Sequence, residues 1–244
     1  MLCYAPLWDN LYAGQINTFA LLAIALAWRA SRRGDERLAG VALAVAIVLK
    51  TSPALLLLHF TAARQWRAVA ACAVTGVVLS AAAALVWRPE YLRTWIDVSM
   101  ATAASTFDYM NLSVEAFAMR LGGESVGKAV HKVLFVSALL VALRRRGRFE
   151  RLVVVMAAFS PIVWYHHLVY LLLPIVSALR AAPWCAWSAV ALLQIERPVA
   201  DHVPALASVP TLAGMLLLFC VPFGEPVDAG SAVTARGGAG PAAA

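Results

Sequence analysis

Long apolar stretches, separated by short arginine-rich connections, run along the chain from Leu11 to Phe223. About 20 helical residues cross the roughly 30 Å of hydrocarbon in a bilayer, so stretches of this length predict membrane-spanning helices. Helices satisfy their own backbone hydrogen bonds in lipid, which favours an all-α, polytopic transmembrane bundle. The candidate spans are residues 11–28, 68–87, 126–143 and 205–223, with a shorter one at 183–196.

Two further apolar segments, residues 38–63 and 152–179, are interrupted near their middle by proline and polar residues. The first break is Lys50-Thr51-Ser52-Pro53, and the second begins at Ser160-Pro161. If both segments turn back within the bilayer, most of the arginine clusters share one side, which the positive-inside rule makes cytoplasmic. We therefore predict two broken or re-entrant helices whose polar tips point the same way and form one site between them.

Composition supports a membrane protein. The 244 residues are 62% hydrophobic and only 14% charged, and the mean hydropathy is +0.78, whereas soluble domains carry roughly 25% charged residues. The net charge of +7 would suggest nucleic-acid binding in a soluble protein. Here the arginines lie in short loops, where they act as topology signals, so no nucleic-acid partner is expected.

The organisation predicted from the sequence is one transmembrane domain at residues 1–226 and a disordered Gly/Ala/Pro-rich tail at 227–244. The connection at 88–125 lacks strong helix periodicity and is expected to be an outer loop of the kind that binds ligands or acts as a lid. The cysteines have no metal-ligand spacing and no Asp-x-Asp sequence is present. We predict no metal site and no cofactor, and the sequence leaves dependence on a divalent metal open.

Lys50 is the first candidate for function, because one lysine at the centre of a membrane helix costs roughly 2.5–3.5 kcal/mol. Such a residue normally faces a polar cavity or an anionic partner, although a lysine can also extend its ammonium group to the membrane interface. The half-helix that begins at Pro53 offers free backbone N–H groups, and Thr51 and Ser52 could cap it. A phosphate is the anion that this arrangement suits best.

His166 and His167 are the second candidates. Adjacent positions do not share a helix face, so the pair is poorly placed to bind zinc. With the neighbouring Trp164 they could bind a sugar, while packing at a polar seam is the alternative. Gln15 and Asn17, at the outer end of a predicted helix, could either cap that helix or bind hydroxyl groups.

Several short patterns occur in an order that resembles the polytopic glycosyltransferase family 87, the DUF2029 group. This group includes polyprenol-phosphate-mannose-dependent mannosyltransferases of actinobacteria. The resemblance covers most of residues 5–180. It rests on Gly14-Gln15-Ile16-Asn17, Lys50-Thr51-Ser52-Pro53, Asn111-Leu112-Ser113, and Ser160-Pro161 followed by Trp164, His166 and His167.

The resemblance implies a multi-pass, GT-C-type enzyme of the bacterial plasma (inner) membrane. It would transfer mannose, with inversion, from a polyprenyl-phosphate-linked donor to a lipid or glycan acceptor on the extracytoplasmic side. In this reading the donor phosphate is bound by Lys50, Thr51 and Ser52. The sugar and acceptor are bound by Gln15, Asn17, Asn111, Trp164, His166 and His167.

The general base of the family is usually an aspartate in the first outer loop. Asp9 lies too close to Gly14 to correspond to it, so the base is expected in a region that precedes this chain. The chain is accordingly interpreted as N-terminally truncated, and the catalytic residue as unknown. Two alternatives stay open: a transporter or flippase, which also uses broken helices with polar tips, and a non-catalytic remnant or scaffold subunit.

Overall fold

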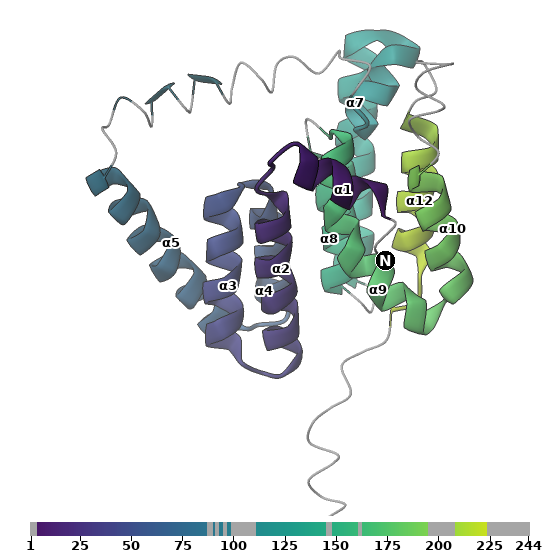
Figure 1. Ribbon diagram of the computed structural model, residues 1–244. Coiled ribbons are helices and arrows are strands. Elements are labelled where there is room, and N and C mark those ends of the chain that lie inside the picture. The colour runs from purple at the N-terminus through teal and green to yellow at the C-terminus, as the bar shows by residue number, and fades with distance from the viewer. Residues whose placement is uncertain are drawn as a thin grey trace, which may run out of the picture.

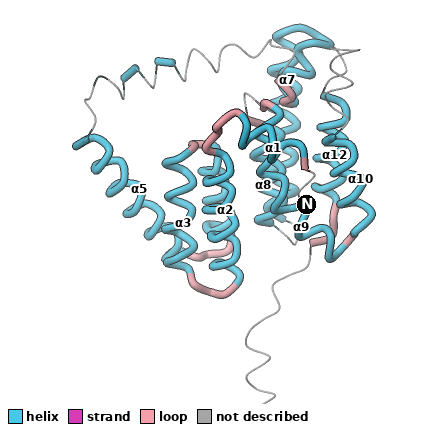
Figure 2. The backbone as a smooth tube through the Cα atoms, in the orientation of Figure 1, coloured by secondary structure: helices cyan, strands magenta, loops and turns pink. Residues whose placement is uncertain are grey.

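Helices make up the described part of the chain. The computed structural model describes residues 4–86, 90, 93–94, 97–98, 111–144, 148–160, 163–194 and 208–223. Within these ranges no strand occurs, so the all-α prediction is confirmed (Figure 1 and Figure 2). In chain order the helices are α1 (Ala5–Tyr12), α2 (Asn17–Arg32), α3 (Glu36–Leu49), η1 (Ser52–Leu56), α4 (Leu57–Ala62), α5 (Trp66–Val86), α7 (Val114–Arg144), α8 (Arg148–Ala158), η2 (Tyr165–Leu171), α9 (Leu172–Ala181), α10 (Pro183–Gln194) and α12 (Ser208–Cys220).

The N-terminal group of helices is built on close contact between α3 and α5. A Cβ atom added to Gly40 of α3 would lie 2.1 Å from the carbonyl oxygen of Ala68 in α5. Only glycine allows the two backbones to approach this closely. At the start of α3, the Asp35 carboxylate accepts a hydrogen bond from the backbone N–H of Leu38 and caps the helix.

The first interrupted segment, residues 38–63, turns back as predicted. Helix α3 ends at Leu49, the next residue Lys50 has an extended backbone (φ −157°, ψ 133°), and η1 and α4 return toward the start of α3. At the end of the return, Ser31 donates a hydrogen bond of 3.0 Å to the side chain of Gln65. The backbone N–H of Arg67 also donates to the Glu36 carboxylate at 3.1 Å. Both ends of the segment therefore lie at the same end of the bundle.

The second interrupted segment, residues 152–179, also reverses direction. Helix α8 starts beside the end of α12, where the Arg151 guanidinium donates to the backbone carbonyls of Phe219 and Val221. At the far end of α8, the backbone N–H of Leu112 donates to the Val163 carbonyl at 2.8 Å. Figure 1 shows α9 running back toward the end where α8 begins. The polar tips of the two interrupted segments thus face the same end of the molecule.

Most of the described arginines gather at the opposite end, which we call the arginine end. They lie at or next to the facing ends of helices α2 and α3, α4 and α5, α7 and α8, and α9 and α10, which are low in the view of Figure 1. This grouping is the one expected if both interrupted segments turn back. The residues are Arg29, Arg32, Arg33, Arg37, Arg64, Arg67, Arg144, Arg148, Arg151 and Arg180.

Two of the described helices, α5 and α7, are long and apolar enough to cross a membrane. Helix α5 carries large apolar side chains on its surface, among them Val77 and Leu85, which are 70% and 89% exposed. Apolar side chains left open along a whole helix are typical of contact with lipid. The runs Ser52–Ala62 and Ser208–Cys220 are apolar but shorter.

Two sequence expectations were wrong in detail. A helix was expected from residue 11, but α1 ends at Tyr12, and a turn containing Gly14 (φ +61°) separates it from α2. The connection at 88–125 was expected to be a loop, yet α7 begins at Val114. At Gly123 (φ +81°) its first arm folds back, so that Glu115 and His131 lie 3.8 Å apart. Pro161 and the predicted tail at 227–244 lie outside the described residues.

Candidate functional site

Helix α1 lies against η2, at the tip of the second interrupted segment, and also contacts the start of α2 (Figure 1). The Tyr4 hydroxyl donates to the Leu168 carbonyl at 2.8 Å, and the Asn10 side-chain amide donates to the His166 carbonyl at 3.3 Å. On the other side, the Thr18 hydroxyl of α2 donates to Asn10 Oδ1 at 2.7 Å. These bonds tie α1 to both η2 and α2. The polar residues beneath α1 are the candidate site, which we call the tip site.

Lys50 lies in this tip site rather than at the arginine end. Its ammonium nitrogen donates to Asn17 Oδ1 at 3.0 Å, and the Tyr170 hydroxyl donates to the same oxygen at 2.9 Å. The ammonium also lies 5.9 Å from the centre of the Tyr170 ring, within the range of a cation–π contact. Lys50 of the first interrupted segment and Tyr170 of the second therefore both bond to Asn17, the first residue of α2.

The side-chain amide of Asn17 has an unpaired hydrogen-bond donor. Its side chain is 1% exposed, and its Nδ2 atom is buried without a hydrogen-bond partner among the described residues. A buried donor left unpaired costs about 1–3 kcal/mol, which a native site normally avoids unless a ligand supplies the acceptor. The amide orientation is fixed by Lys50, because an ammonium group needs the oxygen of Asn17 as its acceptor. The site thus holds an ammonium group next to a buried amide nitrogen that has no hydrogen-bond partner among the described residues.

His166 lies against an acidic residue of α1. Its ring is largely buried, and Nδ1 is 3.6 Å from the Asp9 carboxylate. Asp9 and Lys50 both lie close enough to act electrostatically on this ring. Beside it, His167 stacks on Trp164 with centroids 6.3 Å apart and planes 9° apart, and its Nδ1 accepts from the Trp164 backbone N–H at 3.2 Å. Trp164 is 41% exposed and offers an open ring face at the edge of the site.

Other predicted site residues have different surroundings. Asn111 is buried, and its Oδ1 accepts from the backbone N–H groups of Ser113 and Val163 at 3.1 and 2.9 Å, which joins the start of α7 to the tip after α8. Gln15 is half-buried and lines an apolar groove between α2 and α3. Neither Thr51 nor Asn17 forms the predicted cap: Thr51, which precedes η1, is exposed and makes no side-chain cap bond, and Ile16 is the N-cap of α2. Ser52 is half-buried as the first residue of η1.

Sequence reasoning missed Asp9, Asn10 and Tyr170. Each is ordinary in its local context, and the contacts between α1 or α2 and η2 join residues more than 150 positions apart. The one local signal was a short stretch with Pro6, Asp9 and Asn10 that was too polar for a membrane span. It could have identified α1 as a helix lying on other elements. Among the described residues, no group of three or more His, Cys, Asp or Glu is placed to hold a metal.

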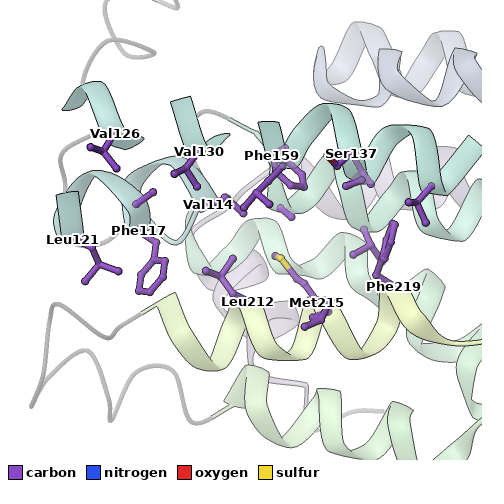
Figure 3. Close-up of a pocket in the computed structure, with 18 of the residues that line it drawn as sticks. Val114, Phe117, Leu121, Val126, Val130, Ser137, Phe159, Leu212, Met215 and Phe219 are labelled. Carbon is purple, nitrogen blue, oxygen red and sulfur yellow. The ribbon is translucent and has the colours of Figure 1, made fainter. Parts of the chain in front are cut away.

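A long apolar groove of about 780 Å³ runs between α7, α8 and α12 (Figure 3). The groove passes Val114, which lies between the end at Leu121 and Val126 and the end at Phe219. Val114 comes two residues after Leu112, which is bonded to the Val163 backbone beside the tip site. Along α7 the groove continues from Val126 to Val141, a helical rise of roughly 22 Å. The labelled side chains in Figure 3, including Phe117, Leu212 and Met215, are apolar with the exception of Ser137. Such a groove suits a hydrocarbon chain.

Comparison with known proteins agrees with the resemblance seen in the sequence. The model of glycosyltransferase family 87 matches residues 1–163, which include Asp9, Asn17 and Lys50, and the match ends one residue before Trp164. Neither the curated proteins nor the solved structures include a match to this chain. The matched part covers most of the chain, from α1 to the tip that follows α8. The chain therefore belongs to glycosyltransferase family 87.

Proposed function

We propose that this membrane glycosyltransferase takes its sugar, mannose, from a polyprenyl-phosphate-linked donor and transfers it with inversion to a lipid or glycan acceptor. Membership of the family supplies the general activity, a transfer of sugar from a donor to an acceptor. The observation that carries the choice of donor is the pair formed by Lys50 and the unpaired Nδ2 of Asn17. An ammonium group beside an unpaired amide N–H suits a phosphate oxygen.

The chemistry explains why a cation is needed there. When the bond between the sugar and the donor phosphate breaks, the leaving phosphate gains negative charge. An ammonium group in a site of low dielectric stabilises that charge much better than it would in water. Lys50 is half-buried and is already held in position by Asn17, so the reorganisation energy needed during the reaction is small. In this proposal Thr51 and Ser52 border the phosphate from the start of η1.

The apolar groove supports a lipid-linked substrate. It passes beside the tip site at Val114 and extends toward the arginine end along α7, α8 and α12. An isoprenoid chain laid in this groove would have its phosphate end near the tips. Apolar walls along the whole length match a hydrocarbon and offer nothing to a sugar nucleotide, whose nucleoside is polar.

The sugar would lie on the outer side of the phosphate. Trp164 offers an exposed aromatic face for a pyranose ring, and His166 and His167 lie next to it. Gln15 and Asn111 complete the proposed sugar and acceptor region from the start of α2 and of α7. Because arginine-rich ends are normally cytoplasmic, the tip site would face the extracytoplasmic side of a bacterial plasma membrane.

A transfer assay tests this proposal. The full chain is purified in nanodiscs and mixed with the radiolabelled β-mannosyl phosphate of a short isoprenol, with octyl α-mannoside as the acceptor. We expect the wild type to bind this donor and label the acceptor, and Lys50→Ala to lose transfer while inserting normally into membranes. Lys132→Ala, which removes an exposed lysine of α7, is the matched control. Unchanged turnover by Lys50→Ala would refute the assignment, and movement of the intact donor across vesicles without transfer would favour a flippase.

A further inference from the structure

Tyr170 joins the second interrupted segment to the tip site, and the proposal above gives it no role. It lies on η2, and its side chain is 2% exposed. Its hydroxyl donates a hydrogen bond of 2.9 Å to Asn17 Oδ1, the oxygen that also accepts from the Lys50 ammonium at 3.0 Å. A buried tyrosine whose polar end bonds to a buried amide is placed to fix the position of that amide.

The side-chain oxygen of Asn17 is saturated by these two donors. An amide oxygen has two lone pairs, and Lys50 and Tyr170 take one each. Two bonds to the same oxygen restrain the plane of the amide, and with it the direction of the Nδ2 group. Without the tyrosine hydroxyl, only the bond from Lys50 would hold this oxygen, and a lysine has a flexible four-carbon stem. The amide and the ammonium group could then move together.

The ring of Tyr170 makes a second contact to the lysine. The Lys50 ammonium nitrogen lies 5.9 Å from the centre of the ring, at the outer limit of a cation–π attraction. Tyr170 also belongs to the hydrophobic core that contains Ala46 of α3 and Leu56 of η1. Packing in a core keeps a side chain in one rotamer. Tyr170 is therefore the rigid partner in the contact, and Lys50 is the flexible one.

Tyr170 lies outside the part of the chain that the family model matches. The match ends at residue 163, and it includes Asn17 and Lys50. Helix η2 brings the tyrosine hydroxyl to Asn17 across 153 positions of the sequence. The segment that follows the match thus contributes a side chain to the tip site.

We propose that Tyr170 is a positioning residue that gives the tip site its preference for a phosphate. The inference rests on the proposed function, because it takes the donor phosphate to lie against Lys50 and Asn17. In this inference the tyrosine hydroxyl does not touch the phosphate. It holds Asn17, and through Asn17 the ammonium group, in place before the donor binds. Groups that are already in position lose less freedom on binding, so the restraint raises the affinity for the phosphate.

The test measures the binding of two ligands to the full chain in nanodiscs. They are the mannosyl phosphate of a short isoprenol and the corresponding isoprenyl mannoside without phosphate. Tyr170→Phe removes the hydroxyl and keeps the ring. We expect it to weaken binding of the phosphate ligand by about three- to tenfold, the effect of one hydrogen bond, and to leave mannoside binding within about twofold. Tyr12→Phe, the same change in a tyrosine of α1 that is 96% exposed, should behave as wild type.

A double-mutant cycle separates positioning from direct contact with the ligand. In an Asn17→Leu background the tyrosine hydroxyl has no amide to hold. Tyr170→Phe should then change binding of the phosphate ligand by less than about twofold, because the two residues act as a unit. A hydroxyl that bonded to the phosphate itself would produce the same loss in both backgrounds.

Three results would overturn the inference and leave the donor assignment intact. They are a Tyr170→Phe variant with the wild-type preference for phosphate, an equal loss of binding for both ligands, as a purely structural role would give, and the same loss in the Asn17→Leu background. A wild type without any preference for the phosphate ligand would refute the proposed donor and the inference together. If either variant fails to fold, NMR of wild type with the phosphate ligand bound decides. A hydrogen bond from Tyr170 to Asn17 is expected there, and its absence would overturn the inference.

Discussion

Asn17 determines the chemistry of the tip site at the scale of single residues. Its side-chain oxygen accepts from both Lys50 and Tyr170, so one amide joins the two interrupted segments. Its nitrogen is buried without a partner among the described residues. An apolar residue here would release Lys50, whereas an acid would keep Lys50 in place and cancel its charge. The change to an acid therefore tests the charge of the ammonium group without altering its position.

Asn17→Asp should weaken binding of the mannosyl phosphate donor by at least about tenfold. The carboxylate keeps an acceptor for Lys50 and Tyr170 but replaces the free N–H with an oxygen that repels phosphate, a loss of about 1.4 kcal/mol or more. The melting temperature should not fall. Gln65→Glu, an amide-to-acid change at the arginine end, is the control. Donor affinity equal to wild type in Asn17→Asp would show that the amide does not touch the phosphate.

The turns within the two interrupted segments place the site at the scale of elements. The reversal at Lys50 depends on an extended residue and a short 3-10 helix that starts beside Pro53, so the return path fits beside α3. That return is held at the arginine end by Ser31, Gln65 and Glu36. The hairpin is in turn supported by α5, which meets α3 at Gly40. The position of Lys50 thus depends on small residues at a helix contact well away from it.

Gly40→Ala should destabilise the fold by about 1–3 kcal/mol, since the new methyl group meets the Ala68 backbone and forces α3 and α5 apart. Gly76→Ala is the matched control, because a Cβ at Gly76 of α5 has no atom within 4 Å. Alanine is the better helix former, so the control should be neutral or slightly more stable. Unfolding followed by circular dichroism in detergent measures both. Equal stability of the two variants would contradict the close packing of α3 on α5.

The molecule as a whole has two different ends. The arginine end holds the facing ends of helices α2 and α3, α4 and α5, α7 and α8, and α9 and α10, and the tip site lies at the other end beneath α1. The apolar groove along α7, α8 and α12 passes beside the tip site and runs toward the arginine end. A donor with a hydrocarbon tail and a phosphate head matches this arrangement.

The sequence predicted those features of the architecture that depend on neighbouring residues, and it did not predict those that depend on contacts between distant residues. The two reversals were predictable from local signals. Lys50 and Pro53 interrupt the first apolar segment, and Ser160 interrupts the second. The positions of the arginine clusters then favoured segments that turn back over segments that cross the membrane. Helix α1 was missed because its sequence has no membrane-like pattern and its position is set by contacts with η2. Asp9 was set aside on its distance from Gly14 along the chain, yet folding brings it to His166. A single sequence contains no pattern from which such contacts between distant segments could be predicted.

The most direct test of the account compares two ligands that differ only in the phosphate. The mannosyl phosphate of a short isoprenol and the corresponding isoprenyl mannoside without phosphate are titrated against wild type and Lys50→Met in nanodiscs. We predict that wild type binds the phosphate ligand at least about tenfold more tightly and that Lys50→Met binds the two ligands almost equally. A Lys50→Met variant that keeps the full preference for the phosphate ligand would contradict the central claim, because the donor phosphate would then lie elsewhere.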